Sequence, residues 1–128
     1  MLDASATIDW LLRTEVGQRI EERIYARDES LHAPYLLDLE VMQVLRRMVY
    51  RREIPDWRGD EAVVDFLRLR VMLYPHRTLL RRIWQMRHNF SAYDAAYVAL
   101  AEQLGATLIT LDTRLAAASG HQASIEIL

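Results

Sequence analysis

The hydrophobic positions along the chain recur mainly at helical spacing. Val16, Ile20 and Ile24, for example, stand at four-residue steps. Spacing of this kind puts apolar side chains on one face and predicts amphipathic helices. The predicted helices cover residues 5–13, 15–27, 37–52, 60–69, 77–88 and 91–104.

Short apolar stretches between these helices predict strands. Residues 107–111 are rich in β-branched and apolar side chains without alternation, which is typical of a strand buried on both faces of a parallel sheet. Further strands are expected at residues 30–33, 70–74 and 125–128, and a first strand just before Asp3. Strands that alternate with helices predict an α/β fold, with a mostly parallel central sheet flanked by helices on both sides.

Composition narrows the class of protein. The 128 residues contain no linker or repeat and fit a single domain over residues 1–128. The absence of cysteine excludes disulfides, thiolate nucleophiles and cysteine-based zinc sites. No signal peptide and no run of about 18 apolar residues is present, so we expect a soluble, cytoplasmic protein outside the membrane.

All 16 basic residues are arginine, and the formal net charge is −2. Because the overall field is weak, any contact with nucleic acid must be local. The absence of lysine argues against receiver domains, haloacid-dehalogenase phosphatases and P-loop NTPases, which rely on a lysine beside the phosphate.

Four acidic residues fall where α/β sheets bind their ligands, at the carboxyl ends of the strands. Asp3 and Asp112 directly follow predicted strands, and Asp94 and Glu40 lie in the first turns of predicted helices. The helix of Asp94 is apolar nearly all round, and Glu40 borders an apolar stripe. Neither carboxylate is therefore expected to point freely into water.

Carboxylates held close together repel one another unless a proton or a cation neutralises them. Oxygen ligands without cysteine or a histidine pair suit Mg²⁺, for which Mn²⁺ can substitute. Such an ion polarises a phosphodiester and activates a bound water. The residues therefore predict phosphodiester hydrolysis at a metal-binding carboxylate cluster.

The segments around these acids resemble PIN-domain ribonucleases, in particular the VapC toxins of VapBC toxin–antitoxin pairs. The similar segments are DASA at 3–6, LLDLEV at 36–41, SAYDAAYVALA at 91–101 and LITLDTRL at 108–115. The resemblance covers essentially the whole chain, in order. It implies a toxin-type endoribonuclease that cuts RNA, forms a homodimer and is inhibited by a cognate VapB-like antitoxin.

The resemblance also implies a role for each acid. Asp3 and Asp94 are the principal metal ligands, and Asp112 completes the pocket directly or through water. Glu40 orients the metal-bound water or binds a second ion. One departure from the family is the short first strand, since only two residues precede Asp3.

Three other residues are candidates for substrate binding. Arg87 precedes the Asp94 helix, and its guanidinium can hold a phosphate through two N–H groups. Ser5 and Thr110 could contact substrate or hydrogen-bond the carboxylates, although a helix cap and an ordinary strand threonine explain them equally well. Asp38 faces about 160° away from Glu40, so solvent or the antitoxin is its expected neighbour.

Structural alternatives remain open for the acids. Asp94 could complete a capping box with Ser91, Asp112 could cap a helix over residues 114–118, and Asp3 could be a solvated terminal residue. Two functional alternatives also remain. One is a non-catalytic PIN-like module that binds RNA or protein, and the other is a metal-dependent phosphatase or DNA nuclease.

Two helices carry more apolar residues than one buried face can use. We therefore predict a groove between helices 5–13 and 35–50 that receives a helical antitoxin segment. Its residues would be Ile8, Trp10, Leu11, Leu12, Leu36, Leu39, Met42 and Val49.

Overall fold

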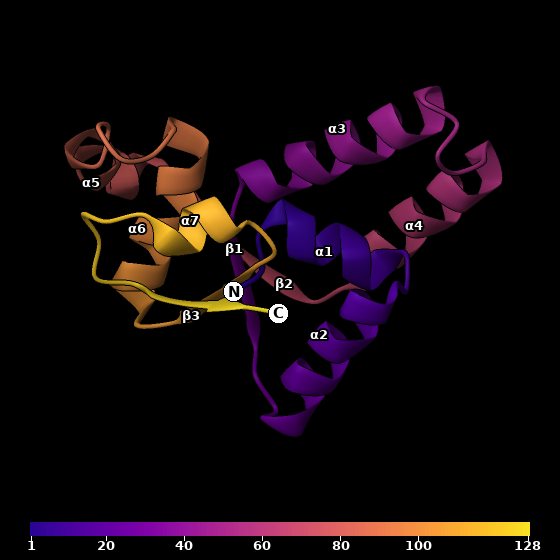
Figure 1. Cartoon of the computed structure of the whole chain (residues 1–128), viewed down its shortest axis with the longest axis horizontal. Helices are drawn as coiled ribbons and strands as arrows, with labels where there is room; N and C mark the ends of the chain where they lie inside the picture. The colour runs from indigo at the N-terminus through magenta and orange to yellow at the C-terminus, as the bar shows by residue number, and fades with distance from the viewer.

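The computed structural model describes residues 1–128 and shows the α/β architecture expected from the sequence (Figure 1). The helices are α1 (Ala4–Leu11), α2 (Glu15–Ala26), α3 (Leu36–Tyr50), α4 (Asp56–Arg68), α5 (Leu80–Gln85), α6 (Ala92–Leu104) and α7 (Thr113–Ala117). The strands are β1 (Leu31–Pro34), β2 (Val71–Tyr74), β3 (Thr107–Thr110) and β4 (Ser124–Ile127). A 3₁₀ turn, η1 (Arg77–Leu79), precedes α5.

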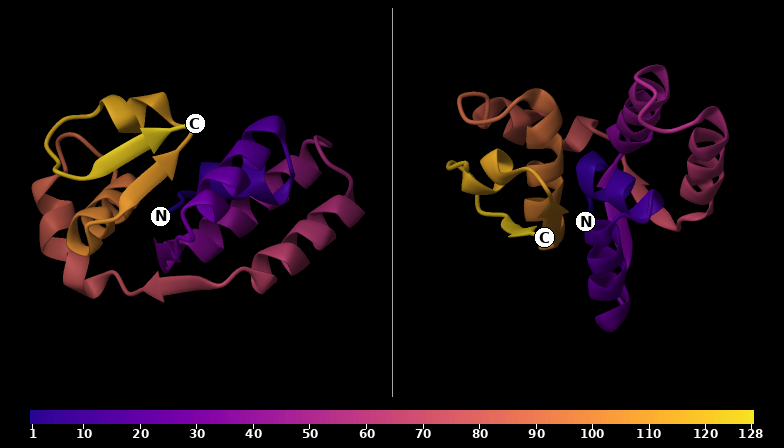
Figure 2. Two further views of the ribbon diagram at one scale, coloured as in Figure 1. Left: turned by 90° about the horizontal axis from the view of Figure 1, so that it is seen from below. Right: turned by 45° about the vertical axis from the view of Figure 1, so that its right-hand side comes forward.

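All strand pairing is parallel, as predicted, but the strands are short. β1 pairs with β2 in register Leu31↔Val71, and β3 pairs with β4 in register Thr107↔Ser124. The N-terminus runs beside β3 and contributes one bridge, between Leu2 and Ile109 (Figure 2). The expected first strand is thus reduced to this bridge, because α1 already begins at Ala4.

Helices cover both faces of the sheet. Side chains alternate along β3, so Leu108 packs into the larger hydrophobic core with residues of α1, α3, α4 and α6. Ile109 points the other way and packs with Leu2, Ile20 and Ile24, which places α2 over the second face. The prediction of a parallel sheet with helices on both faces is confirmed, although the strands form two two-stranded sheets, β1–β2 and β3–β4, rather than one.

Two helix boundaries differ from the prediction. The helix expected at 60–69 begins at Asp56, directly after Pro55, whose fixed φ suits a helix entrance. The helix expected at 77–88 divides into η1 and α5 and then ends in a turn, where the Phe90 amide donates to Met86 O at 3.0 Å. The predicted stop at Gly105 is confirmed, since this residue ends α6 at φ 60°.

The prediction of a groove between helices 5–13 and 35–50 is wrong. Ile8 and Leu11 are buried in the core, while Leu39 is 75% exposed. Hollows of about 190, 380 and 490 Å³ instead surround Trp10, and Glu21 and Tyr25 of α2 help to line them. Apolar residues of α1 therefore pack against both α2 and α3, and the open hollows lie on the side of α2.

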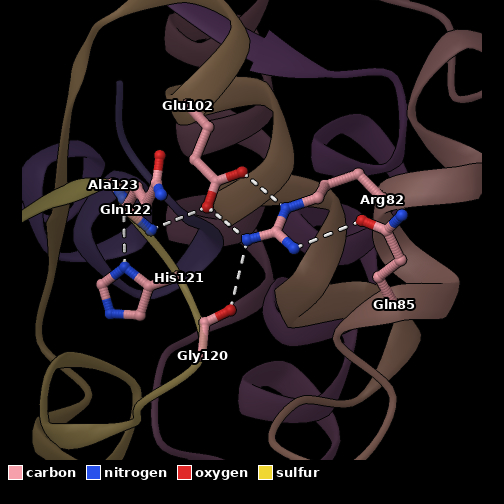
Figure 3. Close-up of polar contacts among 7 residues, drawn as sticks. All are labelled: Arg82, Gln85, Glu102, Gly120, His121, Gln122 and Ala123. Carbon is pink, nitrogen blue, oxygen red and sulfur yellow. Dashed lines mark hydrogen bonds and ion pairs between the residues drawn. The ribbon is translucent and has the colours of Figure 1, made fainter.

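A polar clamp joins α5, α6 and the loop before β4 (Figure 3). The Arg82 guanidinium donates to both oxygens of Glu102 at 2.8 and 2.9 Å, and to Gly120 O at 3.2 Å. The Gln122 amide also donates to Glu102, at 2.8 Å. These bonds tie the far end of α6 to its neighbours.

None of the helices is both long and apolar enough to traverse a membrane.

Candidate active site

The Asp3 carboxylate is buried, at 8% exposure, and surrounded by hydrogen-bond donors. Its Oδ1 accepts from Ser5 Oγ at 2.7 Å and from the Ala6 amide at 2.9 Å, which caps α1. Its Oδ2 accepts from the Thr110 hydroxyl. Asp3 is therefore not a solvated terminal residue, because all its bonds fix it beside the end of β3.

The hydroxyls of Ser5 and Thr110, which donate to Asp3, also bind the loop that follows β3. Thr110 Oγ1 accepts from the Asp112 amide at 3.0 Å, and Ser5 Oγ accepts from the Leu111 amide at 3.3 Å. The first turn of α1 and the residues after β3 are thereby linked by a continuous set of hydrogen bonds.

Asp112 lies at the start of α7. Its Oδ1 accepts from the amides of Arg114 and Leu115 at 2.9 and 3.4 Å, so the carboxylate caps this helix. Capping takes up Oδ1 only. The Arg114 guanidinium lies 3.6 Å from the same oxygen but is 92% exposed, so this ion pair is weak.

Asp94 lies in the first turn of α6, where its amide donates to Ser91 Oγ at 3.1 Å. Asp94 and Asp112 line one shallow pocket of about 210 Å³ together with Ser91 and Arg114. Burial raises the pKa of Asp94, the Ser91 hydroxyl opposes that shift, and the charges of Asp112 and Asp3 raise the pKa further. Three of the predicted acids thus act on one another.

Glu40 lies near the start of α3 and is half-buried. Burial is the main cause that raises its pKa, and the charges of Asp94 and Asp3 add to the rise. A hydrogen bond from Tyr97 Oη to Glu40 Oε1, at 2.7 Å, opposes it. The charges of Asp3 and Asp94 thus act on Glu40, and those of Asp3 and Asp112 act on Asp94.

The four acids are not close enough together to bind one metal ion as a group. No three or more His, Cys, Asp or Glu side chains lie close enough to hold an ion together. The expected carboxylate cluster is thus looser than predicted, and the hydrogen bonds on Asp3, Glu40 and Asp112 give the physical reason. Each of these carboxylates is turned towards donors of its own chain, and mutual repulsion favours that separation.

Other predicted residues lie apart from the pocket. Arg87 is exposed, stacks over the Trp84 ring at 4.6 Å and donates to Trp84 O at 3.0 Å. Asp38 is exposed on α3.

One residue beside the acids was absent from the predicted site. Tyr97 bonds Glu40 directly, and its position three residues after Asp94 on the same helical face was the available signal. The partner of the hydroxyl lies 57 residues away, beyond the reach of local spacing.

Known proteins match the chain over nearly its whole length. The model of the PIN domain family matches residues 1–120. Ribonuclease VapC12 of Mycobacterium tuberculosis is 43% identical over 128 residues, which cover 100% of this chain and 98% of the relative. VapC ribonuclease Mb0985 of Mycobacterium bovis is 38% identical over 128 residues, with coverages of 100% and 97%.

The fold is also seen in a solved structure. The crystal structure of PAE2754 from Pyrobaculum aerophilum matches with a TM-score of 0.64 and 23% identity, over 89% of this chain and 79% of that one. At this identity the likeness concerns the fold alone. The family model and the full-length relatives show that the chain belongs to the PIN domain family.

Proposed function

We propose that this protein is a toxin-type endoribonuclease that hydrolyses RNA phosphodiester bonds with the help of a Mg²⁺ ion. The observation that supports this most is the electrostatic coupling of Asp3, Glu40, Asp94 and Asp112 at the end of β3. Carboxyl groups whose pKa is raised by burial and by neighbouring charges, as those of Glu40 and Asp94 are, are a feature of catalytic sites. The names of the relatives, ribonucleases VapC12 and Mb0985, point to the same activity.

The donor chemistry of the pocket fits Mg²⁺, with Mn²⁺ as a substitute. All four proposed ligands are carboxylates, and Arg114, which is exposed, is the only basic residue whose charge acts on them. Asp3 and Asp94 would be the principal ligands, with Asp112 and Glu40 completing the site. A bound ion would neutralise the acids and polarise the phosphodiester.

The remaining polar residues of the site act on the acids. Ser5 and Thr110 hold the Asp3 carboxylate, and this engagement favours a positioning role over direct contact with RNA. Thr110 also holds the amide of Asp112, so one hydroxyl relates two of the four acids. Arg87 stays a proposed phosphate contact because its guanidinium is exposed, although it lies outside the pocket of Asp94 and Asp112.

Two protein partners are part of the proposal. A VapB-like antitoxin would insert an apolar segment into the hollows around Trp10, which Leu69 and Tyr25 also line. A homodimer would cover exposed apolar residues of α3 and α4, namely Leu39, Tyr50, Trp57 and Leu67. The cytoplasmic location remains a proposal from the sequence.

A substrate comparison tests the proposed activity. The purified protein, free of antitoxin, is incubated with structured RNA, single-stranded DNA and a phosphomonoester, each with Mg²⁺, Mn²⁺ or EDTA. We expect metal-dependent cleavage of RNA, lost in Asp94→Asn and retained in Asp38→Asn, which changes an exposed acid of α3. RNA binding without cleavage would instead establish the non-catalytic module, and turnover of DNA or the monoester the other alternative.

A further inference from the structure

A buried tyrosine connects two of the acid-bearing helices. Tyr97 of α6 is 2% exposed, and its hydroxyl donates to Oε1 of Glu40 on α3 at 2.7 Å. No other hydrogen bond reaches the Tyr97 hydroxyl or the Glu40 carboxylate. Each of the two groups is therefore the other's only hydrogen-bond partner.

The hydroxyl is not explained by packing. Tyr97 stands in a helix whose neighbours Ala96 and Val98 are apolar and buried, and the aromatic ring belongs to the main hydrophobic core. A phenylalanine would fill nearly the same space without bringing a polar atom into that core, where an unpaired hydroxyl is unfavourable. The hydroxyl is therefore explained by its hydrogen bond to Glu40 and not by the packing of the ring.

The position of Tyr97 on α6 indicates what the hydrogen bond to Glu40 does. Tyr97 follows Asp94 by three residues, so one helix presents an acid of the pocket and, one turn later, the donor that holds a second acid. A rigid helix thus sets the place of Glu40 relative to Asp94, even though Glu40 belongs to a different helix. Side chains that must meet one substrate need this kind of support.

We propose that Tyr97 is a positioning residue that holds Glu40 by Oε1 and so presents Oε2 to the metal-bound water or second ion. The proposal rests on the proposed function, since it assigns how Glu40 takes part in the same site. Glu40 then contacts its target through a single oxygen rather than both. Loss of the hydroxyl frees the carboxylate to rotate, while Asp3, Asp94 and Asp112 stay in place.

Charge in the pocket supports the donor role of the tyrosine. Burial first, and then the hydrogen bond and charge of Glu40, raise the pKa of Tyr97 well above its usual range. The neutral phenol donates one hydrogen bond, and Glu40 accepts it. A carboxylate among other acids is in this way held by a neutral group that brings no countercharge.

The test compares Tyr97→Phe with a matched control on the same helix. Tyr93→Phe removes the same atom from a residue that is 67% exposed. With RNA as substrate, we expect Tyr97→Phe to lower kcat about 10- to 100-fold with little change in KM, because a misplaced catalytic group costs rate more than binding. Tyr93→Phe should match the wild type. An unchanged kcat in Tyr97→Phe would overturn the proposal.

A double variant separates positioning from a general structural effect. If Tyr97 acts through Glu40, Tyr97→Phe should cost no further activity in a Glu40→Gln background. The same fold-loss in both backgrounds would contradict the proposal. Crystal structures supply a readout apart from activity: Glu40 should occupy one conformation in the wild type and several in Tyr97→Phe, and an unmoved Glu40 would also overturn it. If the wild-type protein cuts no RNA, the proposed ribonuclease activity is wrong. The positioning role of Tyr97 is then still decided by the conformation of Glu40 in the two crystal structures.

Discussion

The Thr110 hydroxyl donates a hydrogen bond to the Asp3 carboxylate, across 107 positions of the sequence. The same oxygen accepts from the Asp112 amide at 3.0 Å, so one buried side chain relates two acids. A methyl group in place of this hydroxyl leaves an oxygen of Asp3 and an amide without partners. The arrangement of the pocket therefore depends on an atom that belongs to none of the acids.

Thr110→Val, which preserves shape, tests that dependence. We expect it to lower the free energy of unfolding by about 1–3 kcal/mol, the usual cost of unpaired buried polar groups. Metal affinity or activity should fall about 10- to 100-fold, as for other groups that support a ligand. Urea unfolding and RNA cleavage measure the two effects. Thr110→Ser keeps the hydroxyl and should recover most of both, and failure to do so would mean that the methyl group is what matters.

Asp3→Asn and Asp94→Asn should differ in stability, although both should abolish cleavage. Asp3 accepts from three donors, and an amide offers one acceptor oxygen and a competing donor, so we expect a loss of about 1–3 kcal/mol. Asp94→Asn relieves repulsion from Asp112 and should change stability by no more than about 0.5 kcal/mol, or raise it slightly. Chemical unfolding of both variants without metal gives the comparison. Equal losses would show that Asp3 is not held as its hydrogen bonds indicate.

The raised pKa values of Glu40 and Asp94 predict a pH dependence of stability. Because folding raises both, above 4.5 and 3.8 respectively, the folded state binds more protons in the range just above those values. The contribution of these two acids to the free energy of unfolding therefore falls as the pH rises through their folded pKa values. In EDTA, the stability of wild type relative to Asp94→Asn should decline as the pH rises above 3.8, the ordinary pKa of the carboxyl group. A difference that is constant with pH would contradict the assigned direction.

Local patterns predicted most of the fold because the apolar periodicity of each segment reports which face it buries. The first turn of α4 was missed because Trp57 is exposed and Asp56 and Arg58 are charged, so that turn has no apolar stripe. The short first strand follows from Asp3, whose cap on α1 ends the strand almost where the chain begins.

The sequence suggests these four acids as a site because each stands where a strand ends or a helix begins. The structural and functional interpretations of Asp3 and Asp112 proved compatible, because a carboxylate at a helix start caps it with one oxygen and keeps another for a different partner. The contact of Tyr97 with Glu40 was missed because it joins two helices far apart in sequence. Spacing within a helix predicts a shared face but not what the neighbouring helix brings to it.

The clamp between Arg82 and Glu102 gives a last prediction, in the opposite pH direction. The hydrogen bonds from Arg82, the largest cause, and from the Gln122 amide lower the pKa of Glu102 below its ordinary value of 4.5. Its contribution is therefore complete above that value and is lost as the pH falls through the folded pKa. At neutral pH, Glu102→Gln should cost about 1–3 kcal/mol, because a charge-assisted pair and a backbone bond are both weakened. The cost should shrink in acid.

A surface pair on α4 supplies the control for the clamp. Asp65 and Arg68 lie 4.0 Å apart, and the Arg68 side chain is 77% exposed, so Arg68→Gln should change stability by less than about 0.5 kcal/mol at any pH. Urea unfolding of Glu102→Gln and Arg68→Gln at neutral and acid pH compares the two pairs. RNA cleavage by Glu102→Gln should stay near the wild-type rate at temperatures where the variant is folded, because the clamp holds the end of α6 opposite to Asp94. A Glu102→Gln cost as small as that of Arg68→Gln would show that the clamp is no stronger than an exposed ion pair.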